Sequence, residues 1–273
     1  MTHLILGSAG QIGSHLVNYL KRQGEKVYEI DILNNEWEDL RIQDNMILDD
    51  YLKEADIVYF LAFDVGGAKY LEKYQDTSEF IINNMRIMSN TFDAIHQHGK
   101  KMIFASSQMA EMSHSSYGML KALGEKITKD RKGLLVKFWN VYGKEHDEEK
   151  SHVITDFIKM AKRDGVIKMR TDGAESRQFL YAEDACEALF HFAQKYSKLP
   201  KDKEYHISSF EWNTIREVAD FLDVVSSCEV IPSDRKDETQ KNAMNEPNPF
   251  ILKYWKPKTP LKDGIMKLYN LED

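Results

Sequence analysis

The sequence predicts an α/β protein in which helices cover both faces of a parallel sheet. Two observations indicate this fold class. Short apolar or β-branched runs alternate with longer segments of helical period through the first half of the chain, as they do where helices join parallel strands. The chain has 273 residues, of which 42% are hydrophobic, so it can bury the sizeable core that such a sheet needs.

The elements of the first half follow from their patterns. Short apolar runs predict strands at residues 3–6, 26–30, 57–62, 101–105 and 134–139. Apolar residues that recur at three and four positions predict helices at 11–23, 79–98 and 117–130. Gly24 stands where the first helix would be capped.

The second half is less regular. We expect helices at 152–163 and 183–192 and a polar turn at 171–176. The segment 233–260 is rich in Pro, Asn, Asp and Lys, which is typical of loops and turns. The second half therefore predicts a small C-terminal lobe beside the sheet.

The composition excludes several kinds of partner. The net charge is −7 and the basic residues are interspersed with acidic ones, so no nucleic-acid partner is expected. Cys186 and Cys228 lie far apart in the sequence, which predicts free thiols and neither a disulfide nor a metal site. Because there is no basic, apolar leader and no apolar run of about 18 residues, we expect a cytoplasmic protein with no membrane segment.

A glycine turn follows the first strand. Gly7, Gly10 and Gly13 have the spacing G-x-x-G-x-x-G and precede the first helix, where backbone amides can hold a pyrophosphate. Asp31 ends the second strand, where its carboxylate can bind ribose hydroxyls and would repel a 2′-phosphate. The pattern predicts a Rossmann-type doubly wound sheet that binds NAD rather than NADP. The alternative is a glycine turn needed only for tight packing.

Tyr117 and Lys121 are four residues apart and share a face of the predicted helix. A nearby cation lowers the pKa of a phenol, so Tyr117 could take a proton from a substrate hydroxyl as hydride leaves the same carbon. Ser106 and Ser107 end an apolar strand at the carboxyl edge of the sheet, where ligands bind in such folds. The alternative is that Tyr117 is an ordinary half-buried helix residue.

Taken together, the motifs resemble the extended short-chain dehydrogenases/reductases, the NAD-dependent epimerase/dehydratase family of nucleotide sugars. The resemblance rests on Gly7/Gly10/Gly13, Asp31, Asp39-Leu40-Arg41, Leu61-Ala62, Ser106-Ser107, Tyr117/Lys121, Asn140-Val141-Tyr142-Gly143 and Arg177-Gln178-Phe179. It implies that residues 1–145 with about 178–208 form the NAD-binding domain. Residues 146–177 and 209–273 would then form the nucleotide-sugar-binding lobe.

The resemblance also assigns roles to residues. It implies that Tyr117 is the base, that Ser107 binds the reacting hydroxyl and that Lys121 holds the nicotinamide ribose. The implied cofactor-binding residues are Gly7, Gly10, Gln11, Ile12, Gly13, Asp31, Asp39, Leu40, Leu61, Ala62, Tyr117 and Lys121. The implied substrate-binding residues are Gly66, Gly67, Ser107, Gln108, Asn140 and Arg177, with the arginine on the substrate pyrophosphate.

Departures from the family pattern narrow the expected chemistry. Dehydratases of the family carry an Asp-Glu pair after the catalytic hydroxyl, whereas Gln108 and Met109 stand here. The cysteine that the 3,5-epimerising and 4-keto-reducing GDP-sugar branches place near the same point is also absent. We therefore expect hydride transfer at one carbon, C4, as a 4-epimerase or 4-dehydrogenase. The alternatives are a nucleotide keto-sugar reductase that uses NAD(P)H and, in another class, a non-catalytic dinucleotide-sensing regulator.

Three further expectations concern the substrate and the assembly. The segment 63–67 is similar to the A-D-M-G-G segment of GDP-mannose epimerases, which favours a GDP-linked hexose or heptose over a turn without substrate preference. The interval from Ser107 to Tyr117 is short, so the rim of the site should be open or shaped by His114, as a catalytic group or a loop residue. Helices 79–98 and 117–130 could pair in a homodimer, as family members do, or only cover the sheet.

Overall fold

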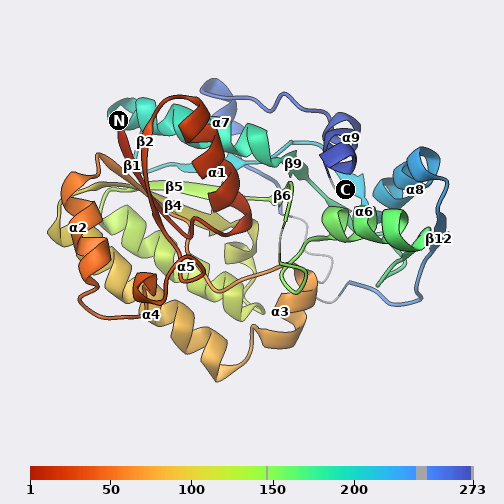
Figure 1. Cartoon of the computed structure of the whole chain (residues 1–273), viewed down its shortest axis with the longest axis horizontal. Helices are drawn as coiled ribbons and strands as arrows, with labels where there is room; N and C mark the ends of the chain where they lie inside the picture. Colours follow the sequence, from red (N-terminus) through yellow and green to blue (C-terminus); the bar gives the residue numbers. More distant parts are fainter. Residues whose placement is uncertain (146, 238–244, 272–273) are drawn as a thin grey trace.

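A six-stranded parallel sheet forms the centre of the larger part of the molecule (Figure 1). The computed structural model describes residues 1–145, 147–237 and 245–271. In spatial order the strands are β2 (Lys26–Ile30), β1 (Thr2–Leu6), β3 (Ile57–Phe60), β4 (Lys101–Ser107), β5 (Leu134–Phe138) and β10 (Glu204–Ile207). Every neighbouring pair in this sheet is parallel, as the alternating pattern predicted.

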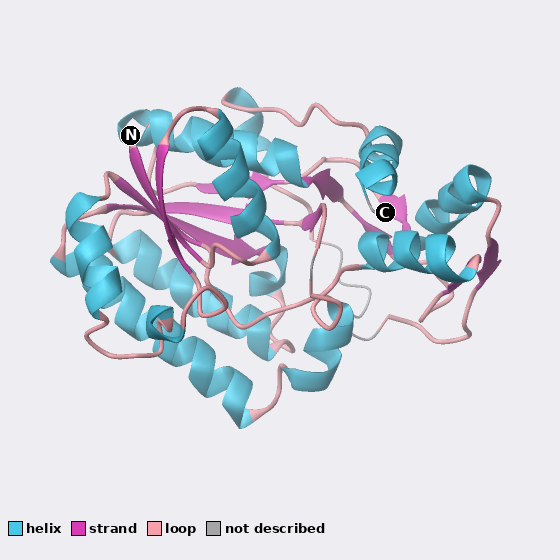
Figure 2. Cartoon of the chain, viewed as in Figure 1, coloured by secondary structure: helices cyan, strands magenta, loops and turns pink. Residues whose placement is uncertain are grey.

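Helices cover both faces of the sheet (Figure 2). One face carries α1 (Gln11–Arg22) and α7 (Ala182–Gln194); the other carries α2 (Met46–Glu54), α4 (Ser78–Gln97) and α5 (Ser116–Asp130). The sequence of β3 explains why both faces need cover, since Ile57 and Tyr59 point into one apolar cluster and Val58 and Phe60 into the other. The predicted α/β doubly wound fold is confirmed.

The strand order places a crevice at the carboxyl edge. The chain passes from β1 to β2 on one side and returns to β3 on the other side of β1. The connections that leave β1 and β3 therefore diverge, and ligands of open α/β sheets bind at such a switch point. The glycine turn between β1 and α1 lies at this point.

A smaller lobe lies beside the carboxyl edge, at the right of Figure 1. It contains α6 (Val153–Asp164), α8 (Ile215–Ser226), α9 (Leu261–Leu271) and two short strand pairs, β7 (Val166–Lys168) with β12 (Glu229–Ile231) and β8 (Ser176–Arg177) with β11 (Asn213–Thr214). β6 (Asn140–Tyr142) pairs with β9 (Phe179–Tyr181) where the lobe meets the sheet, and α3 (Ala68–Tyr74) follows β3. The lobe has its own apolar cluster, which includes Ile154, Ile215 and Ile265.

The proposed residue boundaries of the two parts stay a prediction. Ile251 and Trp255, within the predicted lobe, pack into the apolar cluster of the sheet. Residues 146 and 238–244 of the predicted lobe lie outside the described part of the chain. Among the described residues, no helix has the length and apolar character needed to cross a membrane.

Candidate active site

A cleft of about 670 Å³ runs from the glycine turn along the carboxyl edge of the sheet into the lobe. Every residue that the sequence assigned to cofactor, substrate or catalysis lines this cleft. The structure therefore brings together groups as distant in sequence as Gly7, Tyr117 and Arg177. Their individual roles stay predictions.

The glycine turn forms a tight cradle. Gly7 has φ +86°, and a Cβ there would lie 2.7 Å from the backbone of Ala62, so glycine is required on both counts. A Cβ on Gly13 would lie 1.9 Å from the carbonyl oxygen of Gly7. Gly10 is the N-cap of helix α1 and supplies no side-chain cap, and the first-turn residues of the helix line the cleft. Its amides can therefore serve an anion such as a pyrophosphate.

Two carboxylates stand beside the cradle. Asp31 accepts hydrogen bonds from the amides of Ala9 and Leu33, both at 3.0 Å, and its remaining lone pairs can accept from ribose hydroxyls. Asp39 is paired with Arg41, whose Nη2 lies 2.8 Å away. Burial raises the pKa of Asp39, but the hydrogen bonds from Arg41 outweigh it and hold the pKa below its usual value. The cradle and Asp31 fit a dinucleotide without a 2′-phosphate.

Ser107, Tyr117 and Lys121 meet where β4 ends and α5 begins. The hydroxyl of Ser115 caps α5 by accepting from the amide of Gly118, at 3.0 Å. A Cβ on Gly118 would lie 2.1 Å from the carbonyl oxygen of Met109, so this glycine lets α5 approach the turn after Ser107. The two features place Tyr117 over the strand end that carries Ser107.

Burial is the main cause of the pKa shifts of Tyr117 and Lys121. It raises the pKa of Tyr117 to about 12, and contact with the Ser107 hydroxyl offsets part of the rise. It lowers the pKa of Lys121 to about 7, which Glu125 opposes. The expected lowering of the phenol pKa by the lysine is therefore not found in the protein alone. The Lys121 Nζ lies 5.8 Å from the centre of the Tyr117 ring and 2.7 Å from the carbonyl oxygen of Ala105.

The substrate end of the cleft carries Asn140 and Arg177. Pairing of β6 with β9 brings their two segments together, and Gln108 Nε2 lies 3.4 Å from Asn140 Oδ1. The guanidinium of Arg177 donates to the carboxylate of Asp237 through Nη2. Sequence reasoning missed this carboxylate because it lies 60 residues from Arg177 in a segment without periodicity.

A second ionisable pair that sequence reasoning missed lines the same end. His152 Nδ1 lies 2.6 Å from Glu145 Oε1, and the His152 amide donates to the other oxygen at 2.9 Å. Burial lowers the pKa of His152, but Glu145 outweighs it and raises the pKa above the usual value. A Cβ on Gly67 would lie 2.4 Å from the carbonyl oxygen of Ser151, so the paired glycines give room to the segment that carries this histidine.

His114 lies elsewhere. Its side chain is exposed on the turn before α5 and is not among the described residues that line the cleft. The short interval is filled instead by a 3₁₀ helix at Gln108–Glu111 and by the buried side chain of Met112. The geometry favours the interpretation of His114 as a loop residue.

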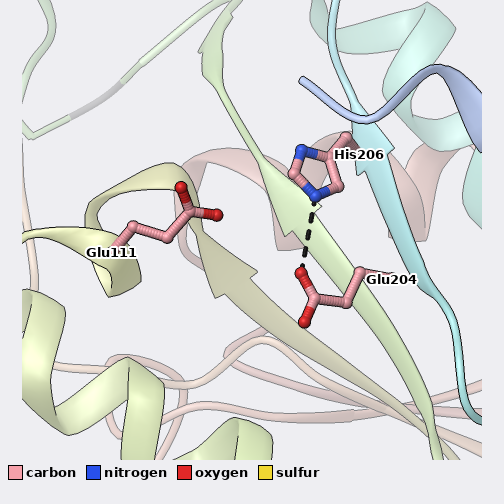
Figure 3. A group of neighbouring side chains, drawn as sticks. All are labelled: Glu111, Glu204 and His206. Carbon is pink, nitrogen blue, oxygen red and sulfur yellow. Dashed lines mark ion pairs between the residues drawn. The ribbon is translucent and has the colours of Figure 1, made fainter. Parts of the chain in front are cut away.

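A cluster of ionisable side chains lies at β5 and β10. Glu111, Glu204 and His206 place potential metal-ligating atoms within 4.8 Å of one another (Figure 3). The ammonium of Lys137 lies 3.1 Å from Glu111, 3.3 Å from Glu125 and 2.9 Å from Glu204. Because the buried ammonium of Lys137 already supplies a positive charge among these partly exposed carboxylates, we interpret the group as an ion cluster rather than a metal centre.

Solved structures share this architecture. A UDP-glucose 4-epimerase of Thermotoga maritima matches with a TM-score of 0.81 at 20% identity, over 99% of this chain and 98% of its own. A GDP-6-OMe-4-keto-L-xylo-heptose reductase from C. jejuni matches with a TM-score of 0.82 at 18% identity, over 99% of this chain and 97% of its own. At these identities the likeness shows the fold.

Curated relatives are similarly distant. A UDP-N-acetyl-alpha-D-glucosaminuronate decarboxylase of Bacillus cytotoxicus is 28% identical over 68% of this chain and 68% of its own. GDP-L-fucose synthase 1 of Arabidopsis thaliana is 24% identical over 97% of this chain and 91% of its own. The names of these proteins cover different reactions on nucleotide sugars.

A family model matches most of the chain. A sequence model of the NAD dependent epimerase/dehydratase family matches residues 3–208, about three quarters of the chain. The matched span includes the glycine cradle, Asp31 and the Ser107, Tyr117 and Lys121 group. The predicted cofactor, NAD, is confirmed as that of the family. The chain belongs to the NAD-dependent epimerase/dehydratase family.

Proposed function

We propose that the protein oxidises a nucleotide-sugar hydroxyl at C4 by hydride transfer, as a 4-epimerase or a 4-dehydrogenase. The observation that carries the proposal is the position of Ser107, Tyr117 and Lys121 in one cleft, between the glycine cradle and Arg177. A dinucleotide in the cradle and a sugar pyrophosphate on Arg177 would meet beside Tyr117.

The residues of the chain account for the proton in this reaction. Bound NAD supplies the hydride acceptor. Tyr117, as phenolate, takes the proton of the sugar hydroxyl, and Ser107 orients that hydroxyl by hydrogen bonding. Lys121 donates to Ala105 and keeps further donors for a ribose hydroxyl. Gln108 and Met109 offer no carboxyl group for an elimination.

Reduction of a nucleotide keto-sugar is the second candidate. Tyr117, with its pKa raised to about 12, holds its proton at neutral pH, and a protonated phenol is the form that protonates a developing alkoxide. His152 with Glu145 adds a second proton-carrying group at the substrate end. The names of the C. jejuni reductase and the Arabidopsis GDP-L-fucose synthase also support this direction.

We further propose a GDP-linked hexose or heptose as substrate. The segment 63–67 and the two GDP-sugar enzymes named above support this choice. The UDP-sugar relatives are the competing outcome. A competition experiment between GDP and UDP for the substrate end would decide between the two nucleotides.

A panel of nucleotide sugars tests the reaction. A new sugar isomer with no net change in cofactor absorbance marks an epimerase, stoichiometric NADH marks a dehydrogenase, and NADH consumption with a keto-sugar marks a reductase. Tyr117→Phe should bind NAD normally and lose turnover by about 10³-fold or more. NAD binding with no turnover of any sugar would contradict the proposal and favour a dinucleotide-sensing regulator.

We also propose that a second copy of the chain covers α4 and α5. These helices pack together and expose large apolar side chains, Ile82 and Met85 on α4 and Met119 and Leu123 on α5. Exposed apolar patches of this kind mark interaction surfaces. Met119→Glu should convert a dimer to monomers in sedimentation, whereas a wild-type monomer would contradict the assembly.

A further inference from the structure

The aromatic ring of Phe63 contacts both Lys121 and Tyr117. The Lys121 Nζ lies 3.8 Å from the centre of the Phe63 ring, closer than to the Phe104 ring at 5.2 Å or the Tyr117 ring at 5.8 Å. The same Phe63 ring meets Tyr117 nearly edge to face, with centres 5.7 Å apart and planes at 76°. Phe63 therefore contacts both members of a pair that do not contact each other closely.

Both contacts have favourable geometry. An ammonium on the face of an aromatic ring is attracted by the ring quadrupole, and more strongly where water is excluded. Lys121 is 3% exposed, and its ammonium donates a hydrogen bond to the carbonyl of Ala105. The edge-to-face arrangement with Tyr117 is a preferred one for aromatic pairs.

The backbone holds Phe63 on both sides. Before it, the amide of Leu61 donates to the carbonyl of Leu6 at 3.0 Å. After it, the fully buried side chain of Asn84 accepts from the amide of Asp64 at 2.7 Å and donates to the carbonyl of Asp64 at 3.1 Å. These hydrogen bonds fix the backbone on both sides of Phe63.

We propose that Phe63 is a positioning residue for the catalytic pair: its face seats the Lys121 ammonium while the same ring packs edge to face with the Tyr117 ring and holds it in place. The inference rests on the proposed function of Tyr117 and Lys121. Removal of the ring would leave the ammonium without its apolar seat and would admit water between the two groups. The lowered pKa of Lys121 agrees with an ammonium kept dry by this ring.

A substitution series separates the aromatic face from bulk. Phe63→Tyr keeps the face, whereas Phe63→Leu keeps apolar volume without it. We expect kcat to fall about 10- to 100-fold in Phe63→Leu and to stay within about 3-fold in Phe63→Tyr, with NAD affinity little changed in both. Asn84→Ala loosens the segment without touching the pair and should give a smaller fall of the same kind.

A readout without turnover tests the contact directly. In NMR spectra, the ring current should shift the ε-methylene signal of Lys121 in the wild type and in Phe63→Tyr. Phe63→Leu should reduce this shift, since the Phe104 and Tyr117 rings remain, and should lower the titration midpoint of Lys121, because leucine still excludes water but lacks the attracting ring face. A wild-type kcat together with a Lys121 signal that keeps its wild-type position in Phe63→Leu would overturn the inference. If Tyr117→Phe remains active, the proposed function fails instead, because the ring-current result does not depend on activity.

Discussion

Arg177 and Asp237 form an ion pair inside the cleft, with side chains only 12% and 9% exposed. If Arg177 binds a substrate pyrophosphate, the Asp237 carboxylate occupies the place of that anion and must give it up. We therefore expect Asp237→Asn to bind nucleoside diphosphates about 5- to 50-fold more tightly, because a partly buried charge pair no longer competes. Calorimetric titration with GDP and UDP measures the effect.

Arg177→Gln is the matched control for this prediction. It should weaken binding of the same diphosphates while leaving NAD affinity unchanged, since Arg177 lies on β8, outside the sheet and the glycine turn. An Asp237→Asn variant that binds more weakly than the wild type would mean that Asp237 supports the substrate site rather than competing for it.

Two alanine substitutions in the glycine cradle, at Gly13 and Gly10, distinguish an effect on protein stability from an effect on NAD binding. A Cβ on Gly13 would clash with the Gly7 carbonyl, so Gly13→Ala should lower the free energy of unfolding by about 1–3 kcal/mol and abolish tight NAD binding. A Cβ on Gly10 would lie 3.4 Å from its nearest neighbour, an ordinary contact. Gly10→Ala should therefore keep its stability, and any loss of NAD affinity would report a pyrophosphate against that backbone. Denaturant unfolding and fluorescence titration measure both.

Much of the fold could be predicted because its signals are local. The strands at 26–30 and 101–107 and the helices at 78–97 and 116–130 were predicted within a few residues, since period and apolar runs act over short windows. Helix α8 and strand β10 were not predicted. Helix α8 does carry local signals, a capping box of Thr214 with Glu217 and buried apolar residues at helical spacing, so the sequence could have predicted it. Strand β10 is a short edge strand, and it is recognised by its pairing with β5, about 70 residues earlier.

The candidate site divides in the same way. Gly7, Tyr117 and Lys121 could be predicted because each motif lies within one strand–turn–helix unit. Asp237 and Phe63 could not, because their contacts depend on tertiary packing between distant segments. The same packing decides the pKa of Tyr117, which the sequence spacing suggested would be lowered and which burial raises.

The Glu145–His152 pair predicts a pH dependence of stability. The pKa of His152 is raised in the folded state, so its contribution is full below the ordinary value of 6.5 and is lost as pH rises through the folded value. The pKa of Glu145 is lowered, although burial opposes this, so its contribution is lost toward acid. Glu145→Gln should therefore destabilise by about 1 kcal/mol near pH 6, a small value because His152 is 35% exposed, and by less near pH 9. Equal effects at both pH values in urea unfolding would contradict the pairing.

Replacing either of two buried lysines, Lys121 and Lys137, by methionine should change the free energy of unfolding, and we expect the two changes to have opposite signs. Burial lowers the pKa of Lys121 from 10.5 to about 7, so below pH 7 the folded state carries a desolvated charge, and stability rises between pH 7 and 10.5 as the folded lysine loses its proton first. Lys121→Met should be inactive. At pH 6 it should be more stable than the wild type by on the order of 2 kcal/mol, a net value that already subtracts the lost hydrogen bond to Ala105. This gain in stability should shrink toward pH 10. Lys137→Met should instead destabilise by about 1–3 kcal/mol at pH 7, because it removes the ammonium beside Glu125 and one of the two lysines that pair with Glu204, the other being Lys129. Urea unfolding of both variants at several pH values compares the two, and a loss of stability in Lys121→Met at pH 6 would show that its ammonium is held by more than the contacts described above.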